Sequence, residues 1–600
     1  MPVAVSAEPV RATRITGGAP ATRAAWAAAA VAVVVATAAN IWVAWGSTIP
    51  VFYTDEVGYV ANAQLLSGIG APRDFSASSY YLGWSVLLVP FWWILQDPEH
   101  VYRAAVAGSV ACGVLVIWPL AALGRRLGMA MPWAIVAAAA VSVAPGHLVM
   151  SNFGLAENFI TLLVATAAIL AVRFAESPSA IRAALLAATG AYLVVTHART
   201  APVVLVTVLW IVVVARRRWR VSLAGVAAAA AVAVPGFLAY NALVPQMYSA
   251  ASNREERGLT RLLQLDPLGA LTAFVGQSWY VFAAWYAVGL LGLVVVVALA
   301  IGEWRGRRGP RIGPATWGLA AFAGVLAFSV IWVATPIARD DPRFDLYAYG
   351  RYLDVALAVL AMVGIAAAVR SARRATALAF GAAALGITAL FLLVVRPQVP
   401  REGWWGPNSV PGLIQWSWPN IHGASEPPWI VASLAGLAAV LLIALSWLLL
   451  PARRRAAVVA SGMLLVMLAS GIAAEVRTIR PSFDPWYTSF TLRHDVERTL
   501  EAHPDASLSF DRRNLSDTLG GVDTVSRNAY QFFLSPRALP VFDSDDEAPE
   551  SELVISRGDW PLGEELGARV VARDTGMFDN TLWVMPGDLQ DELEAAGELE

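Results

Sequence analysis

Long apolar stretches alternate with short polar segments over most of the chain. A membrane-spanning helix needs about 20 mostly apolar residues, and thirteen stretches approach or reach that length. They lie at residues 24–46, 101–123, 131–151, 155–174, 180–197, 201–215, 221–244, 278–302, 315–335, 353–369, 375–395, 429–450 and 456–475. The pattern predicts an all-α polytopic membrane domain over residues 24–477. A cleavable signal peptide is the alternative for the first stretch, which is longer than a typical signal core.

Short arginine-rich loops predict the orientation of these spans. They are "RRRWR" (216–220), "RGRRGPR" (305–311), "RSARR" (370–374) and "ARRR" (452–455), and none contains an acid. Basic loops of this kind stay on the cytoplasmic side. With thirteen spans, we expect a multi-pass plasma-membrane protein with a cytoplasmic N-terminal tail (1–23) and an extracytoplasmic C-terminus.

A shorter apolar stretch, "LGWSVLLVPFWWIL" (82–95), has only 14 residues, with three tryptophans and a proline. It is too short to cross a bilayer upright, and tryptophan favours the membrane interface. We expect an interfacial helix inside a first external loop of residues 47–100. A further long outer loop is expected at 245–277.

The composition turns polar and acidic from about residue 478. "DSDDEAPESE" (543–552) has the character of a solvated loop, "SELVISRGDW" and "ARVVARD" read as short strands, and 493–503 as a helix. We therefore expect an extracytoplasmic α/β domain over residues 478–600.

Composition and charge narrow the class of protein. Hydrophobic residues make up 58% of the chain and charged residues 14%, against about 25% charged in soluble proteins. The net charge is −1, and no basic tract points to a nucleic-acid partner. The single cysteine, Cys112, excludes an intramolecular disulfide.

Two adjacent carboxylates, Asp55 and Glu56, stand at the start of the first external loop in "VFYTDEVGYVANAQLL" (51–66). A solvated helix N-cap is one interpretation, since an acid there meets a favourable helix dipole. Other polar residues are expected on the same face, and this favours a functional site.

These motifs, taken in order, resemble a known class. The Asp-Glu pair, "SSYYLGWSVLLVPFWW", a span ending in "RRL", the turn "SNFGLAEN" and the later "YGRYLD" are similar to the GT-C membrane glycosyltransferases. That class includes protein O-mannosyltransferases and bacterial aminoarabinose transferases. The resemblance covers residues 45–200 and 335–355. It implies a GT-C fold and a polyprenyl-phosphate sugar donor; in the class, the first-loop acid is a catalytic base or helps to hold a divalent metal.

Carried over to this chain, the resemblance implies that Asp55 is the base and Glu56 its neighbour. The leaving lipid phosphate needs cations. Arg351 and Arg199 are placed where outer segments re-enter the membrane, and a guanidinium suits a phosphate bidentately. The alternative for both is an arginine that snorkels to the interface.

The expected substrate-binding residues are His147, Asn152, Glu157, Tyr81 and Tyr349. Ligand chemistry also allows a divalent metal at His147, Glu157 and Asp55. No closely spaced H-x-x-H or D-x-D motif supports it, so no metal is assigned.

The sequence thus predicts a hexosyl or pentosyl transferase that moves a sugar from a polyprenyl-phosphate donor to an envelope glycan, glycolipid or protein in cell wall biogenesis. A transporter or lipid flippase is the alternative. It predicts charges near span centres and inverted repeats, and neither is seen. A third alternative is an inactive envelope scaffold whose C-terminal domain is the working part.

Overall fold

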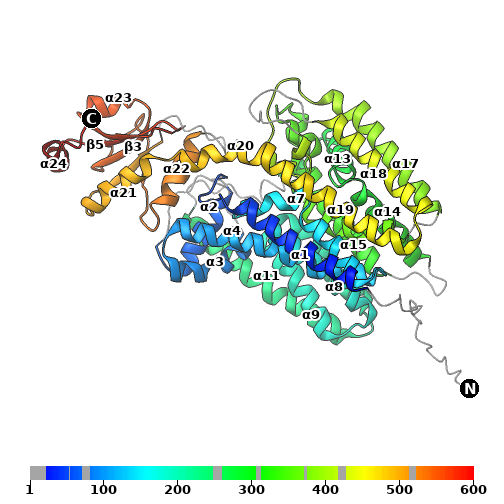
Figure 1. The fold of residues 1–600 in the computed structure, drawn as a ribbon. Coiled ribbons are helices and arrows are strands. Elements are labelled where there is room, and N and C mark those ends of the chain that lie inside the picture. The colour runs from blue at the N-terminus through cyan, green and yellow to red at the C-terminus, as the bar shows by residue number, and fades with distance from the viewer. Residues whose placement is uncertain are drawn as a thin grey trace, which may run out of the picture.

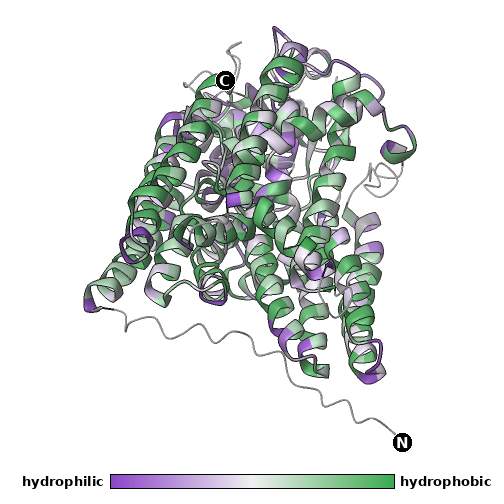
Figure 2. Cartoon of the chain, turned by 90° about the vertical axis from the view of Figure 1, so that its right-hand side faces the viewer, coloured by the Kyte–Doolittle hydropathy of each residue, from purple (hydrophilic) through white to green (hydrophobic). Residues whose placement is uncertain are grey.

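A computed structural model of the protein describes residues 22–52, 55–70, 81–247, 260–305, 312–370, 374–416, 428–512, 522–576 and 578–600. A large helical body is joined to a small domain that contains a sheet (Figure 1). Apolar residues dominate the helical body, whereas hydrophilic residues gather at helix ends and in loops (Figure 2). The N-terminal tail predicted at 1–23 lies almost wholly outside the described residues.

The helical body is made of long helices joined by short turns. Its α-helices are α1 (Arg23–Ala44), α2 (Glu56–Ser67), α3 (Leu82–Leu95), α4 (Pro98–Leu115), α5 (Ile117–Arg126), α6 (Met131–Ser142), α7 (Pro145–Leu148), α8 (Glu157–Glu176), α9 (Ala180–Thr196), α10 (Ala201–Val214), α11 (Trp219–Met247), α13 (Pro267–Ala283), α14 (Val288–Trp304), α15 (Pro314–Ala338), α16 (Arg351–Arg370), α17 (Arg374–Leu390), α18 (Trp429–Leu449), α19 (Ala452–Ala474) and α20 (Arg480–Phe483). Short 3-10 or π turns are η1 (Val149–Asn152), η2 (Ala198–Thr200), η3 (Phe344–Ala348), η4 (Phe391–Val395), η5 (Arg396–Gln398), η6 (Pro407–Ser409), η7 (Ile414–Trp416), η8 (Glu475–Ile479) and η9 (Asp484–Thr488).

Local capping explains where several helices begin. The side chain of Thr22 accepts a hydrogen bond from the Ala25 amide at the start of α1. Asp97 does the same for α4, where a proline occupies the first turn. Asp266 caps α13, again with a proline just inside the helix. Such caps satisfy amides that have no partner within the helix, and proline is tolerated there because its missing N–H costs nothing.

The predicted membrane architecture is confirmed at the level of helices. Within the described ranges, nine helices are long and apolar enough to cross a membrane, and two bent pairs would raise the number to eleven. The closely spaced stretches 180–197 and 201–215 form the shorter apolar helices α9 and α10. Together, the nine long helices, the two bent pairs and these two shorter helices account for the thirteen stretches seen in the sequence. The orientation of the termini stays a prediction.

Two stretches differ from their predictions. Residues 131–151 do not form one straight helix, because α6 and the segment formed by α7 and η1 meet at a bend of 64°. Residues 278–302 do not form a single straight span, because α13 and α14 meet at a bend of 108°. The turn between them passes through Tyr286 and Ala287, both with positive φ. The predicted end of the outer loop at 245–277 is also wrong, since α13 already begins at Pro267. The predicted interfacial stretch is the helix α3, which buries Trp84 and Trp92 and exposes Trp93 and Ile94.

The small domain contains a five-stranded mixed sheet. Its elements are α21 (Leu492–Ala502), β1 (Leu508–Asp511), α22 (Val522–Phe533), β2 (Val541–Phe542), β3 (Leu553–Arg557), α23 (Pro561–Glu565), β4 (Arg569–Arg573), β5 (Asn580–Val584) and α24 (Asp588–Ala596). The strand order is β2-β1-β3-β5-β4, with β1 parallel to β2 and β3, and β5 antiparallel to β3 and β4. The predicted strands correspond to β3 and β4 and the predicted helix to α21. The domain boundary at residue 478 stays a prediction.

The sheet domain contacts α4 of the helical body. Arg493 of α21 forms an ion pair with Glu99 of α4, with Nη1 2.5 Å from Oε1. The ring of Phe532 lies 6.3 Å from that of Tyr102, also on α4. These contacts place the domain at the end of the body that carries the first external loop.

The predicted orientation can be tested by labelling introduced cysteines, because the native Cys112 is buried. Arg218 and Glu564 are both exposed. We expect Arg218→Cys to be protected from a membrane-impermeant maleimide in intact cells and Glu564→Cys to react, since basic loops stay inside. Reaction of Arg218→Cys after membrane permeabilisation is the control. Labelling of position 218 in intact cells would invert the topology.

Candidate functional site

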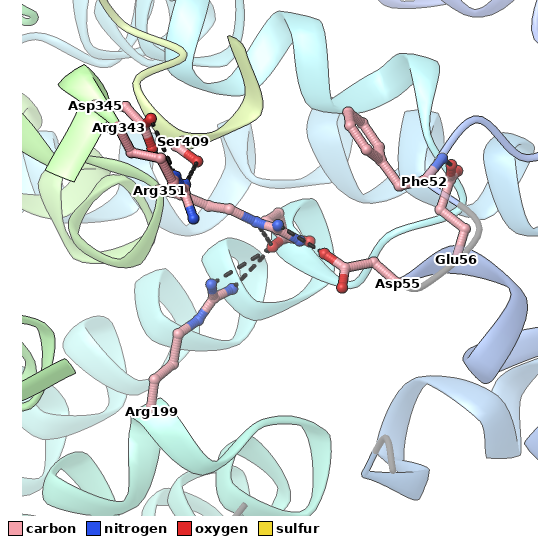
Figure 3. A network of polar contacts seen from close by, with 9 residues as sticks. Phe52, Asp55, Glu56, Arg199, Arg343, Asp345, Arg351 and Ser409 are labelled. Atoms are coloured by element: carbon pink, nitrogen blue, oxygen red, sulfur yellow. Dashed lines mark hydrogen bonds and ion pairs between the residues drawn. The ribbon is translucent and has the colours of Figure 1, made fainter. Parts of the chain in front are cut away.

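Four charged side chains from four separate segments meet in one network (Figure 3). Arg351, the first residue of α16, donates from Nη1 to Asp55 Oδ2 at 2.8 Å and from Nε to Glu157 Oε1 at 2.7 Å. Arg199, in η2, reaches the same Glu157 oxygen at 3.4 Å. Asp55 comes directly before α2, and Glu157 begins α8. The network therefore joins the first external loop to three segments of the helical body.

Local sequence explains two of these placements. Glu157 lies in the first turn of α8, where the helix dipole favours an anion. Arg351 follows Gly350, whose amide donates to the Ser409 carbonyl at 2.9 Å. A Cβ at Gly350 would lie only 1.9 Å from the Tyr280 ring. The glycine in "YGRYLD" therefore allows the close packing that sets the start of α16.

The four side chains differ in their access to solvent. The exposed fraction of the side chain is 26% for Asp55, 12% for Arg351, 6% for Glu157 and 0% for Arg199. Two guanidinium groups and two carboxylates balance each other, which buried charges require. Asp55 is thus the member of the network that an incoming molecule reaches most easily.

Glu56 points away from this network and into the protein, although it follows Asp55 directly (Figure 3). Its carboxylate accepts hydrogen bonds from the amides of Val51, Phe52 and Gly154 and from the Tyr102 hydroxyl, at 2.7–3.0 Å. Burial raises the pKa of Glu56, and these four hydrogen bonds act in the opposite direction. A catalytic role for Glu56 stays a prediction, and its contacts favour a role in holding the first loop.

Two of the other residues predicted to bind substrate are tyrosines that pack against further tyrosines. Tyr349 stacks edge-on against Tyr352, whose ring lies 5.0 Å from the Arg199 guanidinium. Tyr81 stacks on Tyr240 with ring centroids 4.8 Å apart.

His147 and Asn152 are directed elsewhere. His147 is buried, with its ring 5.3 Å from that of Trp285. Asn152, which belongs to the turn "SNFGLAEN", donates to Glu475 at 2.7 Å. The substrate-binding role of all four of these residues stays a prediction.

Asp354 and Glu475 are among the buried acids that the sequence did not single out. Asp354 accepts hydrogen bonds from the Tyr280 hydroxyl at 2.7 Å and the Trp285 indole at 2.9 Å. Glu475 accepts from Asn152 and from Arg480. The sequence signal that could have identified them is a single acid inside an apolar stretch, which in a membrane protein marks a buried or functional position.

The loop "ARDDPRFD" is partly folded into the protein. Asp345 is buried and pairs with Arg343, with Oδ2 2.5 Å from Nη2. A purely solvent-facing loop would leave this acid exposed. Among the residues that the structure describes, no group of three or more His, Cys, Asp or Glu side chains is arranged to hold a metal ion.

An apolar cavity of about 340 Å³ lies next to the network, between α5, α8, α10, α14, α15 and α16. Its wall includes Thr200, which follows Arg199, and Val355, one turn after Arg351. At its other end it reaches Glu303 and Pro314. The charged network therefore stands at one end of a long apolar space.

Comparison with solved structures identifies the architecture. ArnT from Cupriavidus metallidurans, solved bound to undecaprenyl phosphate, matches over 95% of this chain and 99% of its own, at 17% sequence identity and a TM-score of 0.50. The chain has the GT-C fold. This confirms the predicted fold class.

Weaker overall likenesses are to other GT-C proteins. Arabinosyltransferase EmbB from Mycobacterium smegmatis matches over 77% of this chain and 43% of its own, at 15% identity and a TM-score of 0.40. The oligosaccharyltransferase AglB from Archaeoglobus fulgidus matches over 93% and 74%, at 14% identity and a TM-score of 0.37. No protein-family model matches the sequence, and the search of curated proteins gives no match.

The contacts of Glu56 predict a structural effect. Glu56→Ala leaves four donors without their acceptor, and an unsatisfied buried polar group costs about 1–3 kcal/mol. We expect a clear fall in the apparent melting temperature of the purified protein, followed by tryptophan fluorescence, and a smaller fall for Tyr102→Phe, which loses one donor. The exposed Glu501→Ala is the control. An unchanged melting temperature for Glu56→Ala would contradict the structural role.

Proposed function

We propose that the protein is a GT-C glycosyltransferase that moves a sugar from a polyprenyl-phosphate donor to a cell-envelope acceptor on the outer membrane face. The observation that carries the proposal is the pairing of an accessible carboxylate, Asp55, with Arg351 at the end of an apolar cavity. A carboxylate can take a proton, a guanidinium can hold a phosphate, and an apolar space can hold a lipid chain. The GT-C fold supports this combination.

The donor phosphate is assigned to Arg351, with Arg199 behind it. When the bond between the anomeric carbon and the phosphate oxygen breaks, a phosphodiester becomes a phosphate monoester and gains negative charge. A guanidinium at that position stabilises the transition state more than the bound donor. Arg199 reaches Arg351 only through the shared carboxylate of Glu157. Glu157 therefore acts as the positioning residue for both cations.

The polyprenyl chain is assigned to the apolar cavity. The wall begins beside Arg199 and Arg351 and continues between α8, α14, α15 and α16 toward the opposite helix ends. A chain held there leaves its phosphate at the network and its sugar toward Asp55. The fold relative ArnT was solved with undecaprenyl phosphate bound, which supports a lipid of this class as donor.

Asp55 is assigned as the base. The acceptor hydroxyl loses its proton to the Asp55 carboxylate as its oxygen attacks the anomeric carbon, and the lipid phosphate leaves. Asp55 accepts a hydrogen bond from Arg351 at 2.8 Å, which makes the carboxylate less available. An arriving phosphate offers Arg351 another anionic partner, so that donor binding frees the base. The acceptor class is an envelope glycan, glycolipid or protein, and the transferred group is a hexosyl or pentosyl unit.

The transporter or flippase alternative places charges at mid-membrane. Asp354 is the buried acid in α16, but it stands one turn from the helix start, and its two oxygens are held by Tyr280 and Trp285. It therefore lies near the same end of the helix as Arg351. The position of the acids favours a reaction at one face of the membrane over the transport of a substrate through the bilayer. The scaffold alternative leaves the Asp55–Arg351 pair without a function.

Replacement of Asp55 tests the assignment of the base. We expect Asp55→Asn to be inserted normally and to lower sugar transfer by about 10²-fold or more, because general-base catalysis contributes about 10²–10⁴-fold. The assay follows transfer from polyprenyl-phosphate arabinose or mannose to membrane acceptors in proteoliposomes. The control is Asp340→Asn, an exposed acid with positive φ that asparagine tolerates. Near-normal turnover of Asp55→Asn would exclude Asp55 as the base, and donor movement without transfer would favour the flippase.

Replacement of Arg351 tests the phosphate assignment. We expect Arg351→Ala to lower kcat and to raise the KM for the donor, and Arg351→Lys to recover only part, since an ammonium lacks the planar fork. The exposed Arg339→Ala is the matched control from the same external segment. Steady-state kinetics with a short-chain donor separate the two constants. Equal kinetics for Arg351→Ala and Arg339→Ala would show that Arg351 is only an anchor.

A further inference from the structure

A second cavity, of about 280 Å³, lies at the outer end of α1, where the chain passes from α19 toward the sheet domain. It is separate from the apolar cavity, and its wall mixes aromatic and polar side chains. The residues that matter here are Trp42, Trp45, Asn152, Glu475, Arg480 and Asp484. Its volume is close to the lower end of the usual range for ligand pockets, about 300–1,000 Å³. The space suits a ligand of the size of one sugar ring.

The polar side of this cavity is built around Glu475. Helix α19 widens into the π-helix η8 at this residue, and such local widening is frequent at functional sites. Glu475 is only 1% exposed. Asn152 Nδ2 donates to it at 2.7 Å and Arg480 Nε at 3.2 Å. The cavity wall therefore offers a fixed carboxylate, an amide and a guanidinium, which together both accept and donate hydrogen bonds.

The aromatic side is formed by the end of α1. The Arg480 guanidinium lies over the Trp42 ring at 4.2 Å, which fixes that indole against the wall. Trp45 is 82% exposed and also lines the cavity. Tyr487 donates to Ser47 at 3.3 Å and closes the opposite edge. An exposed indole beside hydrogen-bonding groups suits a ligand with one apolar face and many hydroxyls.

The charged side chains in the cavity wall narrow the class of ligand that can bind there. Glu475 and Asp484 supply two carboxylates, and Arg480 supplies one guanidinium. The surplus of negative charge disfavours a phosphate or an acidic lipid headgroup. It accepts an uncharged sugar, or a sugar that carries an amine.

An aromatic cluster separates the cavity from the loop that carries Asp55. Phe483 lines the cavity, and its ring lies 5.0 Å from that of Phe52 and 5.8 Å from that of Phe153. We infer that this cavity is a second, non-catalytic sugar-binding site, which holds one neutral or amino sugar residue of an outer-face glycan apart from the reacting atoms. The inference goes beyond the proposed function and does not require Asp55 to be catalytic.

Saturation-transfer NMR on the purified full-length protein tests the inference. The probes are arabinotriose, mannotriose and galactotriose, with glycerol phosphate as the anionic probe. We expect ring-proton signals from at least one trisaccharide, reduced at least fivefold in both Trp45→Ala and Asp484→Asn. Both residues are exposed, so folding is preserved. Trp26→Ala, at the other end of α1 and also exposed, is the matched control and should retain the signals.

Asp55→Asn separates this site from the transfer site. Signals that persist in Asp55→Asn and vanish in Trp45→Ala support the second site, whether or not transfer activity is found. The inference is overturned if no trisaccharide gives a signal, if Trp45→Ala and Trp26→Ala behave alike, or if only Asp55→Asn abolishes the signal. Preferential binding of glycerol phosphate would also overturn it, because the cavity would then be an anion site.

Discussion

Neutralising Arg351 is the constraint on which the arrangement around the first loop depends. Its guanidinium is nearly buried and is matched by Asp55 from the first external loop and Glu157 from α8. Removing one partner of a buried pair typically costs about 3–5 kcal/mol. The loop, α8 and α16 are therefore held in register by charge, in a region where apolar packing alone would permit sliding.

Two adjacent residues have opposite orientations in this arrangement. Asp55 faces the network, and Glu56 ties the preceding loop to α4 and to the turn before α8 through four hydrogen bonds. For the base that we propose, a rigid loop matters, because a base must be kept within hydrogen-bond reach of the group it deprotonates. Glu56 thus holds in place the loop that carries Asp55, although its own side chain lies outside the charged network.

Hydropathy was sufficient to predict the helical body, because a bilayer requires long apolar helices whatever their packing. The sequence also singled out Asp55 and Arg351, which the structure brings together in one ion pair, while their roles stay a prediction. The bend before α14 was not predictable, because nothing in "AAWYAVG" marks Tyr286 and Ala287 for positive φ. The orientation of Glu56 was not predictable either, since the sequence does not indicate which of two adjacent acids has the buried side chain. Glu475 is bound by Arg480, five residues on, and by Asn152, which is 323 residues away and which no local pattern could pair with it.

The π-helix in α19 has a consequence for how the chain tolerates changes in length. From Ala452 the backbone coils almost without interruption through η8 and α20 to Phe483, and then leads into the sheet domain. A regular α-helix turns about 100° per residue. A π turn holds about one residue more than an α turn, so deleting one residue between Glu475 and Ile479 would restore regular winding and keep Arg493 close to Glu99, whereas deleting one residue from the regular part of α19 would rotate everything beyond it by about that angle. The π turn is therefore the point in this long helical segment where the chain can lose one residue without turning the sheet domain away from the helical body.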